Sequence, residues 1–303
     1  MIYFFKKNLK WIKAFVGIMV ILILFLTFDF NKVISDLKNI PLKYIIFVFL
    51  IQYVKLFLYV TKWIVVVNTY SKIKFKNAFL IYWGGNFANL FGLGSLGQEF
   101  FKIFNFDNKL KGFLLSILDR GLSFCWFIFI AFIGYFLVLL NFESFLYLLG
   151  ILSVLMFSYW VIKFRPNYII WALQKFKFSE IINPLIFSFT KIKPNLLVKH
   201  LIISISLILV GSFEFSLLFK SLNLDINFFS FFVLIPLLST IIILPITYNG
   251  MGLRELVFLF YSRVFGYPFE SLIAFSLLLY FIGFLYQITG IIPFVLIKNH
   301  KIK

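Results

Sequence analysis

Two short glycine-containing stretches each place a carboxylate near the start of an apolar segment. The stretch 94–99 reads Gly-Ser-Leu-Gly-Gln-Glu, and the stretch 250–255 reads Gly-Met-Gly-Leu-Arg-Glu. In both, one glycine lies five residues before the glutamate and a second lies between them. Free amides at a helix N-terminus attract anions, so two such stretches facing each other predict a site for an anionic group such as phosphate. The alternative is structural, since glycines also allow helices to pack closely.

Ionisable residues inside apolar segments extend this candidate site. Asp119 and Arg120 are neighbours in one apolar run, and adjacent residues on a helix do not face each other, so each is expected to have another partner. Lys55 and Glu214 are expected either to pair between helices or to extend toward the membrane surface. Glu99 and Glu255 either cap their own helices or couple to a substrate or proton. The candidate binding residues are Gly94, Gly97, Glu99, Asp119, Arg120, Asn249, Gly250, Gly252, Arg254 and Glu255.

The composition indicates that a lipid bilayer surrounds these residues. Apolar residues make up 62% of the 303 residues, charged residues make up 13%, and the mean hydropathy is +1.02. A soluble domain of this composition would lack a polar coat. The net charge is +18, and the basic residues lie between the apolar runs, as is typical of cytoplasmic loops. This placement argues against a nucleic-acid partner. The single cysteine and two distant histidines predict no metal site, and we expect neither a cofactor nor catalytic residues.

The apolar runs predict an all-α, polytopic transmembrane helical bundle. About 20 apolar residues are needed to cross the hydrocarbon core. Two further segments, 78–97 and 228–262, are interrupted by Gly84, Asn89, Pro236 and other helix-weakening residues, which predicts re-entrant hairpins. The six predicted full crossings are 11–29, 43–67, 112–140, 144–163, 198–220 and 270–297.

The positions of the basic residues predict the orientation of the chain. Both termini and the segments 62–76, 98–111 and 163–199 are basic, so we expect them in the cytoplasm. The two hairpins must then enter the membrane from opposite faces. This arrangement suggests the hypothesis of an inverted repeat, with halves of about 1–140 and 141–303. Arg254 and Arg263 are expected to face outward. We expect one transmembrane domain, 1–303, with a basic cytoplasmic loop at 164–197, in the cell (inner) membrane.

The region 244–296 resembles the C-terminal half of the lysylphosphatidylglycerol synthase transmembrane-region family, the flippase-like module of the multiple peptide resistance factor. The family pattern LPxSxGGxGxRE is matched at Leu244, Pro245, Gly250, Gly252, Arg254 and Glu255, and later at Gly266, Ala274 and Gly290. The stretch from Gly92 to Glu99 resembles the family's PGxxGGE, and Asp119-Arg120 resembles its Arg/Asp pair. The chain departs from these patterns at Phe91, Gln98 and Thr247-Tyr248-Asn249.

The resemblance implies that the chain moves or handles a lipid. In two-domain relatives a separate soluble domain makes the aminoacylated lipid, and no segment here is long enough to hold such a domain. We therefore expect a lipid flippase or transporter that binds an anionic headgroup, and not an enzyme. One alternative is a non-transporting membrane anchor for a lipid synthase or glycosyltransferase partner. A polyprenyl-phosphate sugar transferase is a further alternative, but the eleven acidic residues are scattered and form no DxD pair.

Overall fold

The computed structural model describes residues 30–91, 95–139, 150, 192–243 and 252–297. Within these ranges the regular structure is helical, with no strand. Four helices are long and apolar enough to cross a membrane: α3 (Leu42–Val67), α6 (Lys109–Leu139), α10 (Pro194–Ser221) and α13 (Phe269–Thr289) with its continuation α14 (Ile291–Leu296). They confirm the predicted helices at 43–67, 112–140, 198–220 and 270–297. The predicted crossing 11–29 lies outside the described residues, as do all but residue 150 of the crossing 144–163 and most of the 164–197 loop.

Proline fixes the start of three of the long helices. Pro41 and Pro268 immediately precede α3 and α13, and Pro194 is the first residue of α10. Proline suits these positions because its fixed φ is compatible with the first turn and its missing amide has no helical partner there. Long apolar runs then carry each helix through at least five turns.

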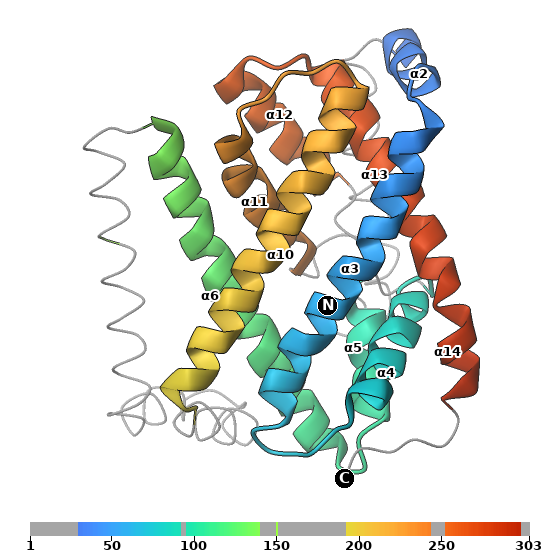
Figure 1. Cartoon of the computed structure of the whole chain (residues 1–303), viewed down its shortest axis with the longest axis vertical. Helices are drawn as coiled ribbons and strands as arrows, with labels where there is room; N and C mark the ends of the chain where they lie inside the picture. Colours follow the sequence, from blue (N-terminus) through green and yellow to red (C-terminus); the bar gives the residue numbers. More distant parts are fainter. Residues whose placement is uncertain (1–29, 92–94, 140–149, 151–191, 244–251, 298–303) are drawn as a thin grey trace, which may run out of the picture.

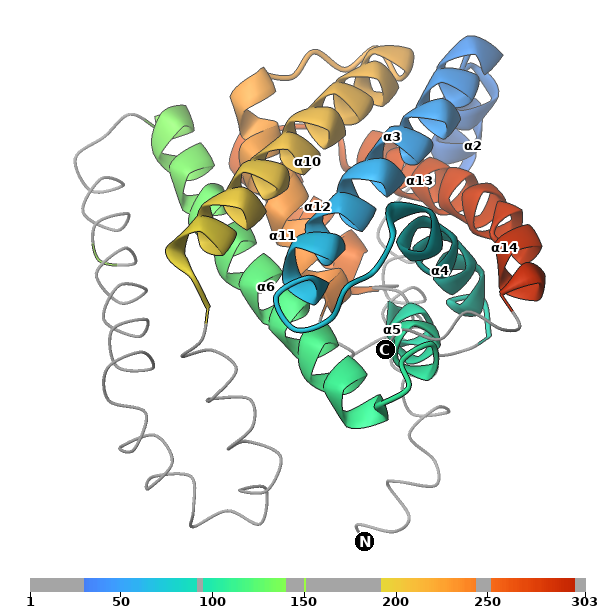
Figure 2. The same cartoon turned by 60° about the horizontal axis from the view of Figure 1, so that its bottom comes forward.

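The long helices pack as an antiparallel bundle (Figure 1). α3 runs down the view of Figure 1 and α10 runs up beside it, while α6 packs against α11 (Phe231–Ile243). The 60° turn in Figure 2 keeps α10 between α6 and α3. Two buried apolar clusters fill the bundle. One contains Phe215, Phe231 and Phe275, and the other contains Trp63 and Phe106.

Two pairs of shorter helices occupy the predicted hairpin segments. α4 (Phe75–Ala88) packs against α5 (Ser95–Phe104), and α11 precedes α12 (Leu253–Phe265). In Figure 1 the α4/α5 pair lies in the lower half and α12 in the upper half. Re-entry into the membrane and the inverted repeat stay predictions.

The predicted interruptions at Gly84, Gly85, Asn86 and Pro236 are wrong, whereas Asn89 and Gly252 lie just outside helices as predicted. The predicted interruptions at Pro245, Asn249 and Gly250 lie outside the described residues. α4 continues through Gly84, Gly85 and Asn86, and α11 continues through Pro236. Gly84 packs closely on α14, because a Cβ at this position would come within 2.9 Å of the Phe294 backbone nitrogen. Tertiary packing of this kind overrides the weak helix propensity of glycine. Within the described residues α4 therefore ends at Ala88 and α5 begins at Ser95, while α11 ends at Ile243 and α12 begins at Leu253.

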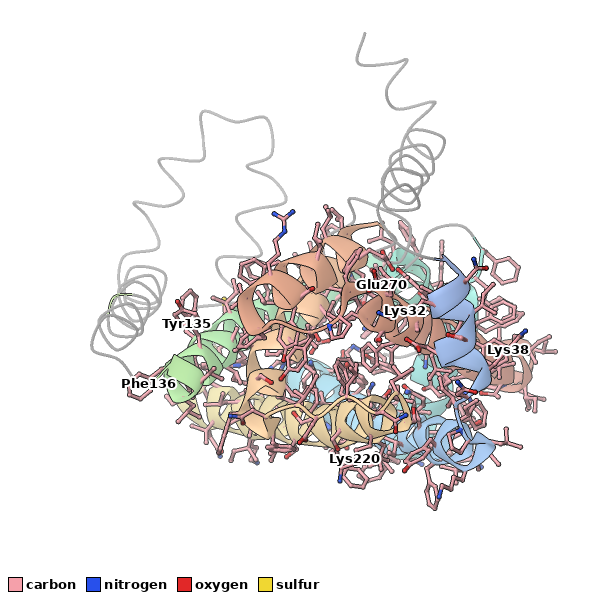
Figure 3. The ribbon with its side chains drawn as sticks, turned by 90° about the horizontal axis from the view of Figure 1, so that it is seen from above. Lys32, Lys38, Tyr135, Phe136, Lys220 and Glu270 are labelled. Carbon is pink, nitrogen blue, oxygen red and sulfur yellow. The ribbon has the colours of Figure 1, made fainter. Side chains whose placement is uncertain are left out.

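The two ends of the bundle differ in charge. The end at the bottom of Figure 1, where α3 ends and α6 and α10 begin, carries seven described lysines and one described acidic residue, Asp107. At the opposite end Lys32 pairs with Glu270 at 3.6 Å, and Figure 3 shows this pair from above. That end is less basic, because its five described basic residues stand against three acidic ones, Asp36, Asp225 and Glu270. Which end is cytoplasmic stays a prediction. The lysines of the basic end are Lys72, Lys74, Lys76, Lys109, Lys111, Lys193 and Lys199.

Candidate functional site: a cationic cavity inside the bundle

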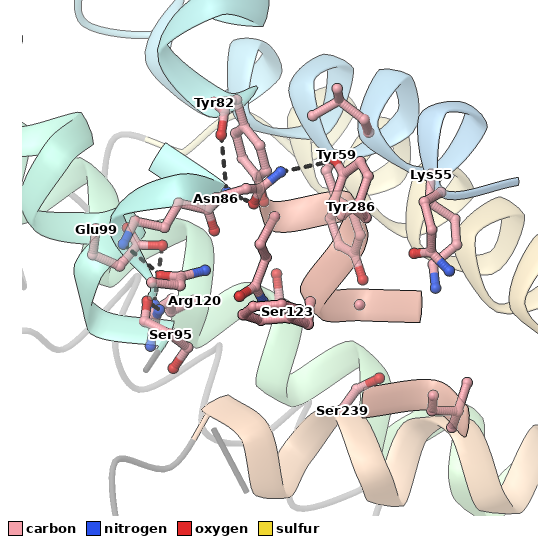
Figure 4. A pocket seen from close by; sticks show the side chains of 18 of the residues that line it. Lys55, Tyr59, Tyr82, Asn86, Ser95, Glu99, Arg120, Ser123, Ser239 and Tyr286 are labelled. Atoms are coloured by element: carbon pink, nitrogen blue, oxygen red, sulfur yellow. Dashed lines mark hydrogen bonds and ion pairs between the residues drawn. The ribbon is translucent and has the colours of Figure 1, made fainter. Parts of the chain in front are cut away.

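A polar cavity of about 450 Å³ lies inside the apolar bundle. Side chains from α3, α4, α5, α6, α11, α12 and α13 line it, so both halves of the chain contribute (Figure 4). A second cavity of about 210 Å³ shares several lining residues with the first, including Lys55 and Arg254. Ionisable side chains at such positions in a membrane protein are costly and usually mark a functional site.

Glu99 is the centre of an ion-pair cluster at the α5 wall. Its Oε1 lies 2.8 Å from Lys102 Nζ and 3.2 Å from Arg120 Nε. Arg120 Nη2 also donates to the backbone oxygen of Ser95 at 2.5 Å, which ties α6 to the first residue of α5. Lys102 is fully buried, so Glu99 is its essential counter-charge. Glu99 Oε2, by contrast, is buried and has no hydrogen-bond partner among the described residues.

Asp119 faces away from Arg120 and toward α10. Its Oδ1 lies 3.2 Å from Nε2 of His200, a completely buried histidine. Asp119 and Arg120 therefore have different partners, which confirms the expectation for adjacent residues on a helix. One turn further along α6, Ser123 accepts a hydrogen bond from Lys62 Nζ at 2.8 Å. Lys62 is buried and lines the cavity, and no carboxylate of the described residues forms an ion pair with it.

Uncharged polar side chains form a connected network on the α4 side of the cavity. Gln98 Nε2 donates to Asn86 Oδ1 at 2.7 Å and to the Tyr82 backbone oxygen at 3.2 Å. Asn86 Nδ2 in turn donates to the Tyr286 hydroxyl at 2.8 Å, which joins α4 to α13. The backbone amide of Gln98 donates to Asn89 Oδ1 at 2.7 Å. These bonds fix the amides in position before any ligand arrives, so the wall is pre-organised.

The α12 side of the cavity has a different organisation. Glu255 Oε2 accepts from the backbone amide of Gly252 at 2.8 Å, and its Oε1 accepts from Ser276 at 2.7 Å. Glu255 is therefore a helix cap that also binds α13. The preceding residue, Arg254, turns into the cavity and places its guanidinium 4.0 Å from the centre of the Tyr280 ring.

Of the cations that line the cavity, Arg254 has the fewest polar partners among the described residues. It is 8% exposed, its Nε has no hydrogen-bond partner, and no acidic residue of the described chain forms an ion pair with it. The start of α12 turns the Arg254 side chain into the bundle, and the expectation that Arg254 lies on the outer side of the membrane stays a prediction. Arg263, two turns later on the same helix, is exposed.

Lys55 completes the cationic lining and lies at the boundary of the two cavities. Its Nζ lies 2.8 Å from Glu214 Oε2, and Gln52 donates to Glu214 Oε1 at 2.7 Å. Of the two alternatives for this lysine, the interhelical pair between α3 and α10 is confirmed. Lys55 and Glu214 largely neutralise each other.

The structure brings together four of the ten candidate residues. Glu99, Asp119, Arg120 and Arg254 line the same cavity, although they come from three helices. Gly97, Gly252 and Glu255 do not line it and instead position the helices that do. Gly94, Asn249 and Gly250 lie outside the described residues.

Sequence reasoning missed Lys62, Lys102 and His200. Lys62 and Lys102 belong to segments interpreted as basic cytoplasmic loops, yet both are buried. Helical spacing could have identified Lys62, because Lys55, Tyr59 and Lys62 recur at intervals of four and three residues on one face of α3. For Lys102, its position three residues after Glu99 allows the observed pair. His200 carries no comparable local signal.

Cations outnumber carboxylates around the larger cavity. Four cationic side chains line it against two carboxylates. Just outside the lining, Glu214 neutralises Lys55, and Lys102 shares Glu99 with Arg120, so five cations face three carboxylates. A buried excess of positive charge is costly when it is empty and favours an anion. The lining cations are Lys55, Lys62, Arg120 and Arg254.

The comparisons with known proteins agree with the resemblance found in the sequence. The family model described as "Lysylphosphatidylglycerol synthase TM region" matches residues 10–290, which include every helix that lines the cavity. Searches of curated proteins and of solved structures found no match. Because the family model covers nearly the whole chain, this multi-pass membrane protein belongs to the lysylphosphatidylglycerol synthase transmembrane-region family.

Proposed function

We propose that this protein transports a lipid between membrane leaflets by holding its anionic headgroup in the cationic cavity. The observation that carries the proposal is the excess of buried cations, above all Arg254 with its unpaired Nε. A guanidinium offers a planar set of donors that matches phosphate oxygens. The acyl chains would stay in the surrounding lipid, whose contact the exposed apolar faces of α3, α10 and α13 favour.

The two helix pairs supply the elements that such a transporter needs. Short helices that meet inside a bundle are typical of transporters that alternate access around a fixed central site. α5 brings Glu99 to the cavity and α12 brings Arg254. Movement of either pair would change the exposure of the headgroup site. No Walker-type phosphate-binding loop occurs in the sequence, so we expect a gradient or the lipid concentration difference to provide the driving force.

The orientation in the membrane is part of the proposal. We expect the lysine-rich end of the bundle and both termini to be cytoplasmic. In a Cys125→Ser background, a membrane-impermeant maleimide added to intact cells should label Lys38→Cys and should not label Lys72→Cys. Both positions are exposed and lie at opposite ends of α3. The reverse labelling pattern would contradict the orientation.

Reconstitution in liposomes tests transport directly. Movement of labelled anionic phospholipid from the inner to the outer leaflet is measured for the wild type, Arg254→Gln and Arg263→Gln. Loss of a charge-assisted contact predicts a rate about tenfold or more lower for Arg254→Gln. Arg263→Gln is the matched control, because it removes the same charge from an exposed position on the same helix.

The outcomes separate transport from the main alternative. A wild-type rate equal to that of empty liposomes, with folded protein confirmed, would contradict transport and favour a non-transporting anchor for a lipid- or glycan-synthesis enzyme. In that case the search moves to a protein partner.

A further inference from the structure

The cavity walls differ in chemistry, and the difference bears on which headgroup fits. Arg254 and Lys62 supply positive charge that no carboxylate of the described residues neutralises by an ion pair. Gln98, Asn86 and Tyr286 form the uncharged wall of the same cavity. We infer that the ligand is a phosphodiester lipid whose headgroup ends in a neutral, hydroxyl-bearing group, and that cationic aminoacyl headgroups are disfavoured. This inference rests on the proposed function in taking the cavity as the headgroup site.

The positive side of the cavity accounts for the phosphodiester. The Arg254 side chain is more than nine-tenths buried, and its Nε lacks a partner. Tyr280, whose ring lies under the guanidinium, also has a buried hydroxyl without a hydrogen-bond partner in the described structure. Unsatisfied buried donors are costly in a low-dielectric interior. The oxygens of a phosphate group would supply acceptors for both.

The uncharged wall accounts for the hydroxyl groups. Both Nε2 protons of Gln98 are already donated, so its Oε1 is the part that can accept from a ligand. Tyr286 accepts from Asn86, which leaves its own proton to donate. The side-chain amide of Gln287 lines the same cavity and offers both functions. A hydroxyl group can pair with an acceptor and a donor together, whereas an ammonium group only donates.

The carboxylates of the cavity are engaged in ways that disfavour an incoming cation. Asp119 faces His200, and Glu214 in the second cavity faces Lys55. Glu99 keeps Oε2 without a partner, but Lys102 and Arg120 both contact its Oε1. The cluster of these three side chains carries a net positive charge, so Oε2 suits a neutral hydroxyl donor better than an ammonium group. A lysyl ester of phosphatidylglycerol, with two ammonium groups and one phosphate, would add positive charge to a positive cavity.

Competition for binding in detergent micelles tests the inference without requiring transport. Fluorescent phosphatidylglycerol is bound to the purified full chain, and unlabelled lipids are added as competitors. Phosphatidylglycerol should displace the probe at a concentration about tenfold or more lower than lysyl-phosphatidylglycerol or phosphatidylpropanol, which lacks the hydroxyls. Soluble glycerol phosphate should compete more weakly than phosphatidylglycerol if the source is a lipid. Equal competition would assign the site to the free phosphate ester.

Two variants test which wall of the cavity binds the phosphodiester and which binds the hydroxyl groups. Arg254→Gln should weaken binding of phosphatidylglycerol and phosphatidylpropanol alike, while Arg263→Gln should bind as the wild type does. Gln287→Leu should weaken only phosphatidylglycerol, so phosphatidylpropanol is its internal control for correct folding.

Several results would overturn the inference. Equal or stronger displacement by lysyl-phosphatidylglycerol would refute the exclusion of cationic headgroups, and equal displacement by phosphatidylpropanol would refute the hydroxyl requirement. Failure of folded wild-type protein to bind the probe would refute both. Selective binding without movement in liposomes would instead contradict the transport function and leave the inference standing.

Discussion

The α4/α5 pair and the α11/α12 pair contain similar Gly-x-Gly-to-Glu stretches but use them differently. Glu99 is the fifth residue of α5, which begins at Ser95. It forms ion pairs with Lys102 and Arg120. Glu255 is the third residue of α12 and accepts from the backbone amide of Gly252. The third position is where a glutamate can reach back to the helix start, and the fifth position is beyond that reach. The position of the glutamate in its helix, fifth or third, therefore decides whether it forms ion pairs or caps the helix.

The glycines of the two stretches are also needed for different physical reasons. Gly97 lies inside α5, where a Cβ would overlap the carbonyl group of Ala88 on α4. Gly252 precedes α12 with φ of +82°, a conformation that side-chain-bearing residues rarely adopt. One glycine permits contact between helices and the other permits a turn. A spacing shared by two stretches is thus weak grounds for assigning them the same role.

The largest expected effect comes from Glu99→Gln. The substitution leaves the fully buried Lys102 without its counter-charge and weakens the hold on Arg120. Removing one partner of a buried ion pair costs about 3–5 kcal/mol, so the free energy of unfolding should fall by about that amount. Titration of the protein from mild detergent into SDS micelles measures the change.

A second substitution sharpens the assignment of Glu99. Lys102→Met should recover much of the lost stability in the Glu99→Gln background, because it removes the uncompensated charge and keeps a long apolar side chain. If the double variant is as unstable as the sum of the two single variants, Lys102 and Glu99 do not act as a pair.

Gly97→Ala should have the next largest effect. The added methyl group meets backbone atoms of α4, which cannot rotate away, so α4 and α5 must separate. Overpacking of this kind costs about 1–3 kcal/mol, and we expect a value near the upper end. The same SDS titration measures it. Gly85→Ala is a useful companion, since its Cβ meets Gln98 Cγ at 2.9 Å and backbone atoms only at 3.4 Å, so it should cost less than the backbone overlap at Gly97.

Gly252→Ala should be milder than Gly97→Ala. The positive φ of this residue would cost an alanine about 1–2 kcal/mol, less than we expect for the backbone overlap at Gly97. The α12 start should loosen, and Arg254 next to it should bind phosphatidylglycerol less tightly. A loss of stability larger than that of Gly97→Ala would reverse the comparison of the two regions.

Particular residues show how far the sequence alone leads. The four long helices follow from apolar length and from prolines such as Pro41 and Pro194, which are local signals. The acid–base partners inside the bundle depend on which helices pack together, as with Asp119 and His200, separated by 81 positions. The sequence therefore predicts that Asp119 has a partner, and only the packing of α6 against α10 identifies it.

The final span illustrates the same limit within one helix. Gly283, Gln287 and Gly290 lie on α13 or at its end, and the sequence favours helix packing for all three. Gly290 does pack, since a Cβ there would lie 2.5 Å from the Trp83 carbonyl oxygen. Gly283 and Gln287 line the cavity instead. Spacing places residues on one face of a helix, but what lies opposite that face comes from the tertiary fold.

The smallest expected effect is that of Glu255→Gln, although this residue occupies the same place in its motif as Glu99. The glutamine carbonyl oxygen can still accept from the Gly252 amide, and Ser276 can still pair with the side chain. Helix-cap changes cost about 1 kcal/mol, and this conservative one should cost less. No buried cation loses its partner, so binding of phosphatidylglycerol should stay within about twofold of the wild type, a change of less than 0.5 kcal/mol. The measurements are the SDS titration and the micelle competition, with Glu99→Gln alongside. A Glu255→Gln defect as large as that of Glu99→Gln would mean that Glu255 acts through its charge, and the two motifs would then share a role after all.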